Sequence, residues 1–484
     1  MSLRNQALSG FRWTAGARLT SQLITWSITL IVIRILSPAD YGLLAMATVF
    51  VSLLNMFSEL GLGAAIVQKP ELDDTLVRRV FAVVLSVHFL LAALLILAAP
   101  LIGRFYEDAR VVPVVQALSL QFVLAAFAVV PNSLLQRQME FKFRSLLDLG
   151  AAVFTGVVTL FLAFRGLGVW ALVVGSLLGQ LCRTVGLNLV SPYFKRPNFA
   201  LDGMWPLLKF GGSLTLAQVL GMLFLQADIL ICAKIIGTEF LGFYTIAMHL
   251  ASLPNQRISA LVNQVAFPAF SSMQSDPGRV AENMLLGARI LGFVTMPILW
   301  GLSGLSSEII SVILGEKWMP ALLTLQVIAL VMPLRMVANF IQVANQGIGR
   351  AEFILTNAIW AVVVGPILFF AGSWLWGGAG LSLSWLLVSP ILFLQIAFRG
   401  GAGLPMERFA ILRSMGHSLL PALGMLLAIH GARLLIGDAL GALFRLPCLI
   451  LLGAVVYILL SRLANHEGLK EVLGFLRGLR GSKA

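Results

Sequence analysis

The sequence predicts an all-α membrane protein that crosses the bilayer many times. Of its 484 residues, 59% are hydrophobic and only 11% are charged, and the mean hydropathy is +0.94. A water-soluble fold cannot bury this much apolar material, so the apolar runs are expected to face lipid. A third observation, an internal repeat with an offset of 200 residues, divides the chain into two homologous halves.

About fourteen segments are apolar and long enough to cross roughly 30 Å of hydrocarbon at about 1.5 Å per residue. The first seven lie near residues 13–36, 41–63, 77–102, 112–135, 146–165, 169–190 and 207–235. The second seven lie near residues 241–263, 284–303, 321–342, 353–372, 377–398, 414–436 and 441–462. The loops between them are too short to hold a soluble domain.

The repeat is clearest where the stretch from Ile31 to Asn55 returns, without a gap, as Ile231 to Asn255. Seven of the 25 aligned positions are identical, among them Gly42 with Gly242. Because the offset spans six helices, an even number, the two halves enter the membrane in the same direction and the substrate path is expected between them. We therefore expect one six-helix lobe at 1–200, a second at 201–400, and two additional helices with a basic tail at 401–484.

The net charge of +13 reflects basic loops rather than nucleic-acid binding. The N-terminus, the even-numbered loops and the tail hold 21 of the 34 Lys and Arg residues, whereas the odd-numbered loops hold eight. The positive-inside rule then places both termini in the cytoplasm, beside anionic membrane lipid. The three cysteines lack the spacing of a metal site or a disulfide framework, and no cofactor, metal site or catalytic residue is expected.

Five basic residues remain inside the predicted spans, near their cytoplasmic ends: Arg18, Arg183, Arg257, Arg289 and Arg335. An intramembrane Arg costs about 3 kcal/mol or more, so it needs a carboxylate, a wet cavity or an anionic ligand. A phosphate group is such a ligand because guanidinium groups match phosphate oxygens. Alternatively, the long side chain snorkels to the headgroups. Arg18 and Arg257 are the strongest cavity candidates because their helices belong to the repeated pair, and Arg335 is included with them.

Polar side chains at helical spacing mark the repeated helices. Such stripes face protein or water in a membrane, so these helices are expected to meet around a wet substrate cavity. The alternative is interhelical hydrogen bonding without a cavity, worth about 0.6 kcal/mol per pair. The residues are Arg18 and Gln22 in the first span, Thr48, Ser52 and Asn55 in the second, Gln218 in the seventh, and Ser252, Asn255, Gln256 and Ser259 in the eighth.

Two acids, Glu59 and Asp228, lie within predicted spans and are candidates for coupling transport to protons or sodium. A carboxylate in a low dielectric has its pKa raised toward the working range, which suits a proton site. Ion pairing is the alternative for both: Glu59 with Arg18, which lies at a similar depth, and Asp228 with Lys234, six residues later.

Four segments carry a family resemblance: RILSPADYGLLAMA, FSELGLGAAIVQK, PNSLLQRQMEFKFRSL and GEKWMPA, which begin at residues 34, 57, 131 and 315. They resemble the Wzx-type polysaccharide flippases, nearest to the colanic-acid-exporter-like branch of the multidrug/oligosaccharidyl-lipid/polysaccharide exporter superfamily. The resemblance covers most of residues 1–400 and implies a MATE-like, V-shaped pair of six-helix lobes.

The same resemblance implies a function without covalent chemistry. Such a flippase moves a polyprenyl-diphosphate-linked oligosaccharide repeat unit, an O-antigen or exopolysaccharide precursor, from the cytoplasmic to the periplasmic leaflet of a bacterial inner membrane by alternating access. A polysaccharide polymerase and a chain-length regulator are the expected protein partners.

Two other functions remain as alternatives. A cation-coupled multidrug exporter of the same fold would need an acid-lined cavity, and the surplus of intramembrane Arg argues against it. A membrane-embedded polysaccharide polymerase or ligase usually needs a large periplasmic loop with catalytic Arg or His, whereas the odd-numbered loops here are short and hold no His.

Overall fold

The computed structural model describes residues 25–59, 66–67, 73–193, 195–200, 224, 226–437 and 441–481. These residues are helical or in turns and bends, and none of them lies in a strand, so the all-α prediction is confirmed. The chain forms two compact units, Met1–Gly242 and Phe243–Ala484.

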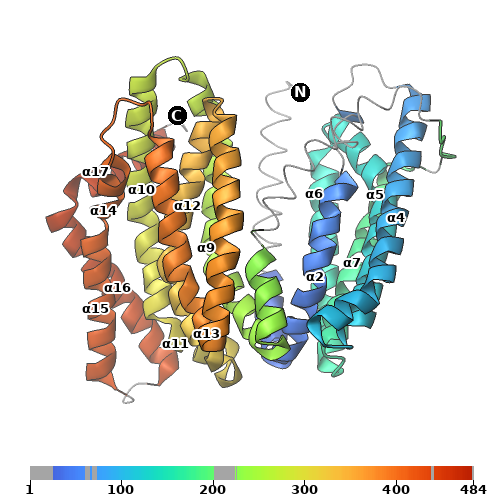
Figure 1. Cartoon of the computed structure of the whole chain (residues 1–484), viewed down its shortest axis with the longest axis horizontal. Helices are drawn as coiled ribbons and strands as arrows, with labels where there is room; N and C mark the ends of the chain where they lie inside the picture. The colour runs from blue at the N-terminus through green and yellow to red at the C-terminus, as the bar shows by residue number, and fades with distance from the viewer. Residues whose placement is uncertain are drawn as a thin grey trace. The chain divides into compact units, whose positions relative to one another are not determined.

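The first unit is a helical bundle (Figure 1). α4 packs on α5, α6 packs on α7, and α5 contacts both α2 and α7. Apolar clusters lie between these helices, one around Phe81 and Val130 and another around Leu36 and Ala171. The described helices are Thr25–Ile35, α2 (Pro38–Glu59), α4 (Asp74–Tyr106), α5 (Val111–Arg137), α6 (Phe141–Phe164), α7 (Val169–Val190), the helical stretch 226–235 and the first turn of α9.

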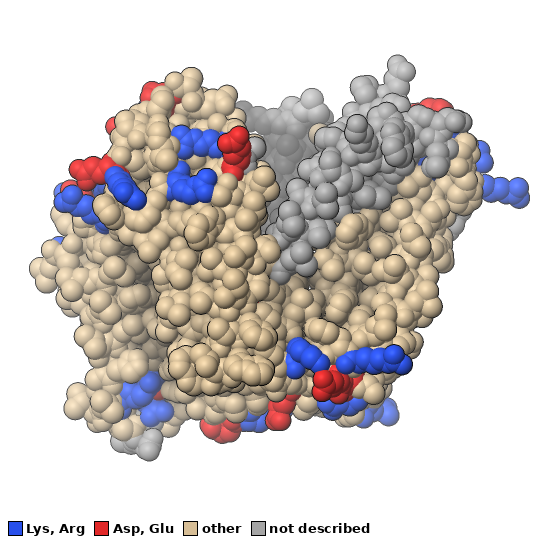
Figure 2. All heavy atoms as spheres, viewed as in Figure 1, with Lys and Arg blue, Asp and Glu red and all other residues tan. Residues whose placement is uncertain are grey.

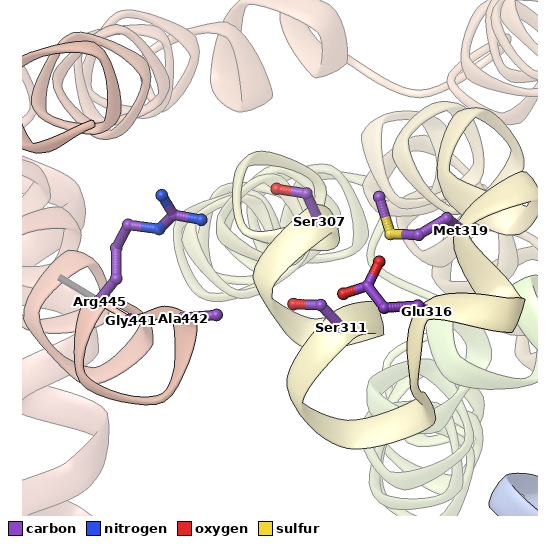
Figure 3. A pocket seen from close by; sticks show the side chains of 7 residues that line it. All are labelled: Ser307, Ser311, Glu316, Met319, Gly441, Ala442 and Arg445. Carbon is purple, nitrogen blue, oxygen red and sulfur yellow. The ribbon is translucent and has the colours of Figure 1, made fainter. Parts of the chain in front are cut away.

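The second unit is built around α12, which packs against α10 and α13. One large apolar cluster joins these helices to α14, α15 and α16. The elements are α9 (Thr238–Ser272), α10 (Pro277–Gly304), α11 (Ser306–Ile309), the π-helical turn η1 (Ile310–Leu314), the 3-10 turn η2 (Glu316–Ala321), α12 (Leu322–Gly347), α13 (Ala351–Gly400), α14 (Ala410–Gly416), α15 (Leu419–Ile436), α16 (Ala442–Ala464) and α17 (His466–Gly481). A cavity of about 290 Å³ lies beside η1, η2 and the first residues of α16 (Figure 3).

α13 is two antiparallel helices joined at a break. Trp376 and Gly377 leave the helical conformation, and Gly377 has a positive φ of 56°, which glycine adopts at little cost. The two arms are tied by hydrogen bonds from Ser384 Oγ to the Leu368 carbonyl oxygen (2.9 Å) and between the amides of Gln395 and Asn357 (2.9 Å). This helical hairpin corresponds to the two predicted spans at 353–372 and 377–398.

Ten described helices are long and apolar enough to cross a membrane. Helix is present within each of the fourteen predicted spans, but the count of fourteen remains a prediction. On the face seen in Figure 2, charged side chains lie toward the ends of the helices and leave an uncharged band between them. The chain is therefore a multi-pass membrane protein.

The two copies of the repeated turn contact each other within the first unit. A Cβ added at Gly42 would lie 1.9 Å from the carbonyl oxygen of Thr238, and one at Gly242 would lie 1.8 Å from that of Pro38. The offset of 200 equates Gly42 with Gly242 and Pro38 with Thr238, so the same contact is made twice with the roles exchanged. Only glycine permits so close an approach of two backbones.

Candidate functional site

α9 carries a polar face in the second unit, as the helical spacing predicted. Ser259 Oγ donates to Asn255 Oδ1 (2.8 Å), and Gln256 Nε2 donates to Ser252 Oγ (3.3 Å), each across one helical turn. Gln256 is exposed and the other three side chains are half-buried. These hydroxyl and amide groups are pre-oriented by one another and retain further donor and acceptor positions, so the face can hydrogen-bond a polar, uncharged ligand.

The corresponding face of α2 lies in the first unit. Asn55 is exposed, its carbonyl oxygen accepts from Ser58 Oγ (2.7 Å), and Thr48 Oγ1 donates to the Ala45 carbonyl (3.1 Å). Three other predicted cavity residues, Arg18, Gln22 and Gln218, lie outside the described residues. The backbones of Glu59 and Arg257 belong to α2 and α9, but their side chains lie outside the described part of the chain.

Arg335 on α12 lies over an aromatic ring of a neighbouring helix. Its guanidinium carbon is 4.5 Å from the centroid of the Trp385 ring on α13. Trp385 Nε1 in turn donates to the hydroxyl oxygen of Tyr244 on α9 (2.8 Å). The ring attracts the cation through its π face. Three helices of the second unit thus hold one cationic group.

Two of the five predicted intramembrane arginines have carboxylate partners on neighbouring helices. Arg183 Nε on α7 lies 2.8 Å from Asp148 Oδ1 on α6. Arg289 on α10 lies 2.7 Å from Glu471 and 3.5 Å from Glu467, both on α17. For these two residues the structure favours a structural ion pair over a substrate contact.

Asp228 is buried, with 4% of its surface exposed, and its Oδ1 accepts from the backbone N–H of Ile229 (2.9 Å). The suggested pairing with Lys234 is wrong, because Lys234 Nζ lies 2.6 Å from Glu107 Oε1 in the loop after α4. The role of Asp228 in ion coupling stays a prediction.

Two acids that the sequence reasoning missed, in the loop between α4 and α5, bind the end of the helical stretch 226–235 and the first residue of α9. Besides the pair between Glu107 and Lys234, Thr238 Oγ1 donates to Asp108 Oδ2 (2.9 Å). The adjacent Lys234 lowers the pKa of Glu107. Arg110, together with the Thr238 hydroxyl, holds the pKa of Asp108 at about 2. Both acids are therefore ionised at neutral pH.

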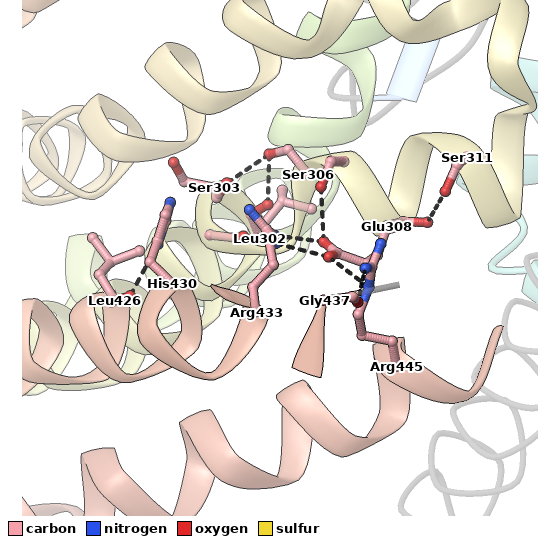
Figure 4. A network of polar contacts seen from close by, with 12 residues as sticks. Leu302, Ser303, Ser306, Glu308, Ser311, Leu426, His430, Arg433, Gly437 and Arg445 are labelled. Carbon is pink, nitrogen blue, oxygen red and sulfur yellow. Dashed lines mark hydrogen bonds and ion pairs between the residues drawn. The ribbon is translucent and has the colours of Figure 1, made fainter. Parts of the chain in front are cut away.

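Glu308 on α11 is a buried acid that the sequence reasoning also missed. Its side chain is 0% exposed and lies between two guanidinium groups from the C-terminal helices (Figure 4). Arg433 on α15 donates to both carboxylate oxygens (2.8 and 2.5 Å), and Arg445 Nε on α16 lies 3.3 Å from Oε1. The sequence does show an acid within the apolar run that follows Ser307, which indicates that Glu308 needs a partner. The partners themselves lie more than a hundred residues later in the chain.

Within the described ranges, no group of three or more His, Cys, Asp and Glu side chains is arranged to hold a metal ion. The polar face of α9 can bind a ligand through hydrogen bonds. Arg335 can bind a ligand through its positive charge. Both sets lie on helices of the second unit.

Residues 31–323 match a protein family described as "Polysaccharide biosynthesis protein". The chain is similar to the lipopolysaccharide biosynthesis protein WzxC of Escherichia coli, with 25% identity over 81% of this chain and 80% of the relative. It is also 27% identical to the succinoglycan biosynthesis transport protein ExoT of Rhizobium meliloti, over 62% of this chain and 61% of the relative.

Two solved structures share the fold. The lipid II flippase MurJ, in an inward closed conformation, superposes with a TM-score of 0.74 at 16% identity, covering 94% of this chain and 99% of MurJ. An inward-facing multidrug resistance transporter of the MATE family in the MOP superfamily gives a TM-score of 0.59 at 16% identity, covering 79% of this chain and 95% of that transporter. The predicted MATE-like fold is confirmed.

Proposed function

Because the chain belongs to the polysaccharide biosynthesis protein family, we propose that it is a flippase without covalent chemistry. It moves a polyprenyl-diphosphate-linked oligosaccharide, an O-antigen or exopolysaccharide precursor, from the cytoplasmic to the periplasmic leaflet of a bacterial inner membrane. ExoT, to which the chain is similar in sequence, is named as a transport protein, and MurJ, which shares the fold, is named as a flippase.

The observation that carries the proposal is the polar face of α9. A membrane helix whose exposed and half-buried positions bear amides and hydroxyls is suited to sugar hydroxyl groups, which both donate and accept hydrogen bonds. Asn255 and Gln256 supply amides to this face, and Asn55 occupies the equivalent position of the first repeat. Gln22 and Gln218 are assigned to the same cavity by their spacing.

The diphosphate is assigned to arginine. Arg335 lies over the Trp385 ring, 4.5 Å from its centroid, and its guanidinium carries the positive charge and the fork of donors that suit a phosphate. Arg18 and Arg257 are proposed as further diphosphate ligands on the grounds of their depth and their place in the repeat.

The lobes at 1–200 and 201–400 would move by alternating access, with both termini in the cytoplasm. The reciprocal contact of Gly42 with Thr238 and of Gly242 with Pro38 supports the repeat, because equivalent residues of the two copies exchange roles in it. Asp228 and Glu59 are the proposed sites of proton or sodium coupling. A polymerase and a chain-length regulator would receive the product.

Reconstitution into liposomes tests the function directly. With a fluorescent polyprenyl-diphosphate-linked oligosaccharide on one leaflet, we expect the protein to accelerate its appearance on the other leaflet. Arg335→Ala should slow this transfer about tenfold, the loss of one charge-assisted contact. Arg408→Ala removes an exposed arginine that also lies over a ring, Phe398, and should leave the rate unchanged. Equal rates for wild type and Arg335→Ala would refute the diphosphate assignment.

A cation-coupled multidrug exporter is the second candidate, favoured by the MATE-like fold and by the buried carboxylate of Asp228. The same liposomes distinguish the two functions. Transport of a lipophilic cation that depends on Asp228, with no transfer of the lipid-linked oligosaccharide, would support the exporter and contradict the flippase.

A further inference from the structure

The cavity beside η1, η2 and the start of α16 is separate from the polar face of α9. Ser307, Ser311 and Glu316 line one side of it, and Gly441, Ala442 and Arg445 line the other. Arg445 and Glu316 extend into it from opposite sides, with the two serines between them (Figure 3). Its volume of about 290 Å³ is at the lower end for ligand pockets, which suits a small headgroup better than an oligosaccharide.

One side of the cavity accepts hydrogen bonds. Ser307 Oγ donates its proton to Glu308 Oε2 (3.0 Å), and Ser311 Oγ donates to the Glu308 carbonyl oxygen (3.3 Å). With their protons directed to Glu308, both hydroxyls offer only lone pairs to a ligand. The carboxylate of Glu316, an exposed residue, adds a negative charge on the same side. This half of the cavity therefore matches a primary ammonium group.

The other side donates hydrogen bonds and is positively charged. Arg445 Nη1 is held by the Gly437 carbonyl oxygen (2.9 Å), and its Nε lies 3.3 Å from Glu308. Because Arg433 shares the same carboxylate, the two guanidiniums and one acid carry a net charge of about +1 beside the cavity. The N–H groups at the start of α16 lie on this side as well. This half matches a phosphate.

The cavity lies where lipid headgroups are expected. Two of the candidate membrane spans, Glu316–Gly347 and Ala442–Ala464, begin at residues that line it. The boundary between apolar span and loop is the depth at which phospholipid phosphates and amines reside.

We propose that this cavity binds the headgroup of a zwitterionic phospholipid with a primary ammonium, of the phosphatidylethanolamine type. The phosphate contacts Arg445 and the start of α16, and the ammonium contacts Glu316 and the hydroxyls of Ser307 and Ser311. A choline headgroup lacks N–H donors and is normally held by aromatic rings, which the lining residues do not supply. An anionic glycerol headgroup would leave Glu316 without a counter-charge.

The full-length protein in detergent can be tested by native mass spectrometry with lipids of matched acyl chains. We expect phosphatidylethanolamine to be retained at least about tenfold more strongly than phosphatidylcholine or phosphatidylglycerol, the value of one charge-assisted hydrogen bond. Retention should fall stepwise as the amine is methylated once, twice and three times. Equal retention of phosphatidylethanolamine and phosphatidylcholine by the wild-type protein would overturn the proposal, and this arm needs no variant.

Variants locate the effect. Glu316→Gln should abolish the preference for phosphatidylethanolamine, whereas Glu352→Gln, at an exposed acid in the first turn of α13, should preserve it. A full preference in Glu316→Gln would assign the lipid to another site. Free phosphoethanolamine should compete weakly, because it lacks the acyl chains. Competition at equal concentration would show that the ligand is a soluble zwitterion and would overturn the lipid assignment.

Discussion

The reciprocal glycine contact makes a sharp prediction about Gly42→Ala. A Cβ at this position would lie 1.9 Å from the Thr238 carbonyl oxygen, whereas ordinary contacts of a Cβ begin near 3.4 Å. The two helix starts must therefore separate by about 1.5 Å, the difference between these distances. Forcing extra volume into a packed site costs about 1–3 kcal/mol, against about 1 kcal/mol gained from the helix propensity of alanine.

Gly150→Ala is the matched control, because Gly150 lies within α6 and an added Cβ there meets nothing within 4 Å. Gly150→Ala should be stabilised by the higher helix propensity of alanine, so the midpoint of thermal unfolding in lipid nanodiscs should rise. Gly42→Ala should lower it, and Gly242→Ala should do the same because its Cβ meets Pro38 at 1.8 Å.

The double variant Gly42→Ala/Gly242→Ala should be destabilised by less than the sum of the two single-variant effects, because both substitutions separate the same pair of helix starts. A fluorescence-monitored melt of the four variants measures all of these differences. If Gly42→Ala and Gly150→Ala shifted the midpoint alike, the close approach of the two turns would be refuted.

Three other predictions follow from the charged contacts. Glu308→Gln leaves two arginines without their shared carboxylate and should destabilise the protein by about 3 kcal/mol, seen as faster hydrogen exchange in α15 and α16. The pKa of Asp108 is depressed from 3.8 to about 2, first by Arg110 and to a smaller extent by the Thr238 hydroxyl, so the stability that its ionised form contributes is complete above about pH 4 and is lost as the pH falls toward 2. Hydrogen exchange at the start of α9 should rise over that window, and Asp108→Asn should remove the dependence. Arg289→Ala should increase proteolysis within α17 by releasing Glu471, a loss of up to about 1 kcal/mol, whereas Arg279→Ala, at an exposed site on the same helix, should not.

Periodicity and the repeat predicted the elements that depend on local spacing. The face of α9 was predicted because Ser252, Asn255, Gln256 and Ser259 recur at helical intervals, and the structure joins them by hydrogen bonds across single turns. The break in α13 lies at the boundary predicted between the two spans at 353–372 and 377–398. Both features are determined by residues near one another in the chain.

Contacts between distant residues were harder to predict. Lys234 was matched with Asp228 because both lie on one helical stretch, yet its partner is Glu107, 127 residues earlier. The charge of Arg289 is paired with Glu471, 182 residues later, and the charge of Glu308 is paired with arginines on α15 and α16. A residue's hydropathy and neighbours indicate that a charge needs a partner, but tertiary packing decides which one.

The buried Glu308 constrains the order in which the protein is made. Arg433 is synthesised 125 residues after Glu308, which at about 5–20 residues per second is a delay of roughly 6–25 s. During that interval the carboxylate must stay in contact with water, because burying a charge without its partner is costly. The turn that carries it therefore completes its packing only when the last helical hairpin arrives. A nascent chain that stops short of α15 would expose this unpaired acid to the machinery that removes incomplete membrane proteins.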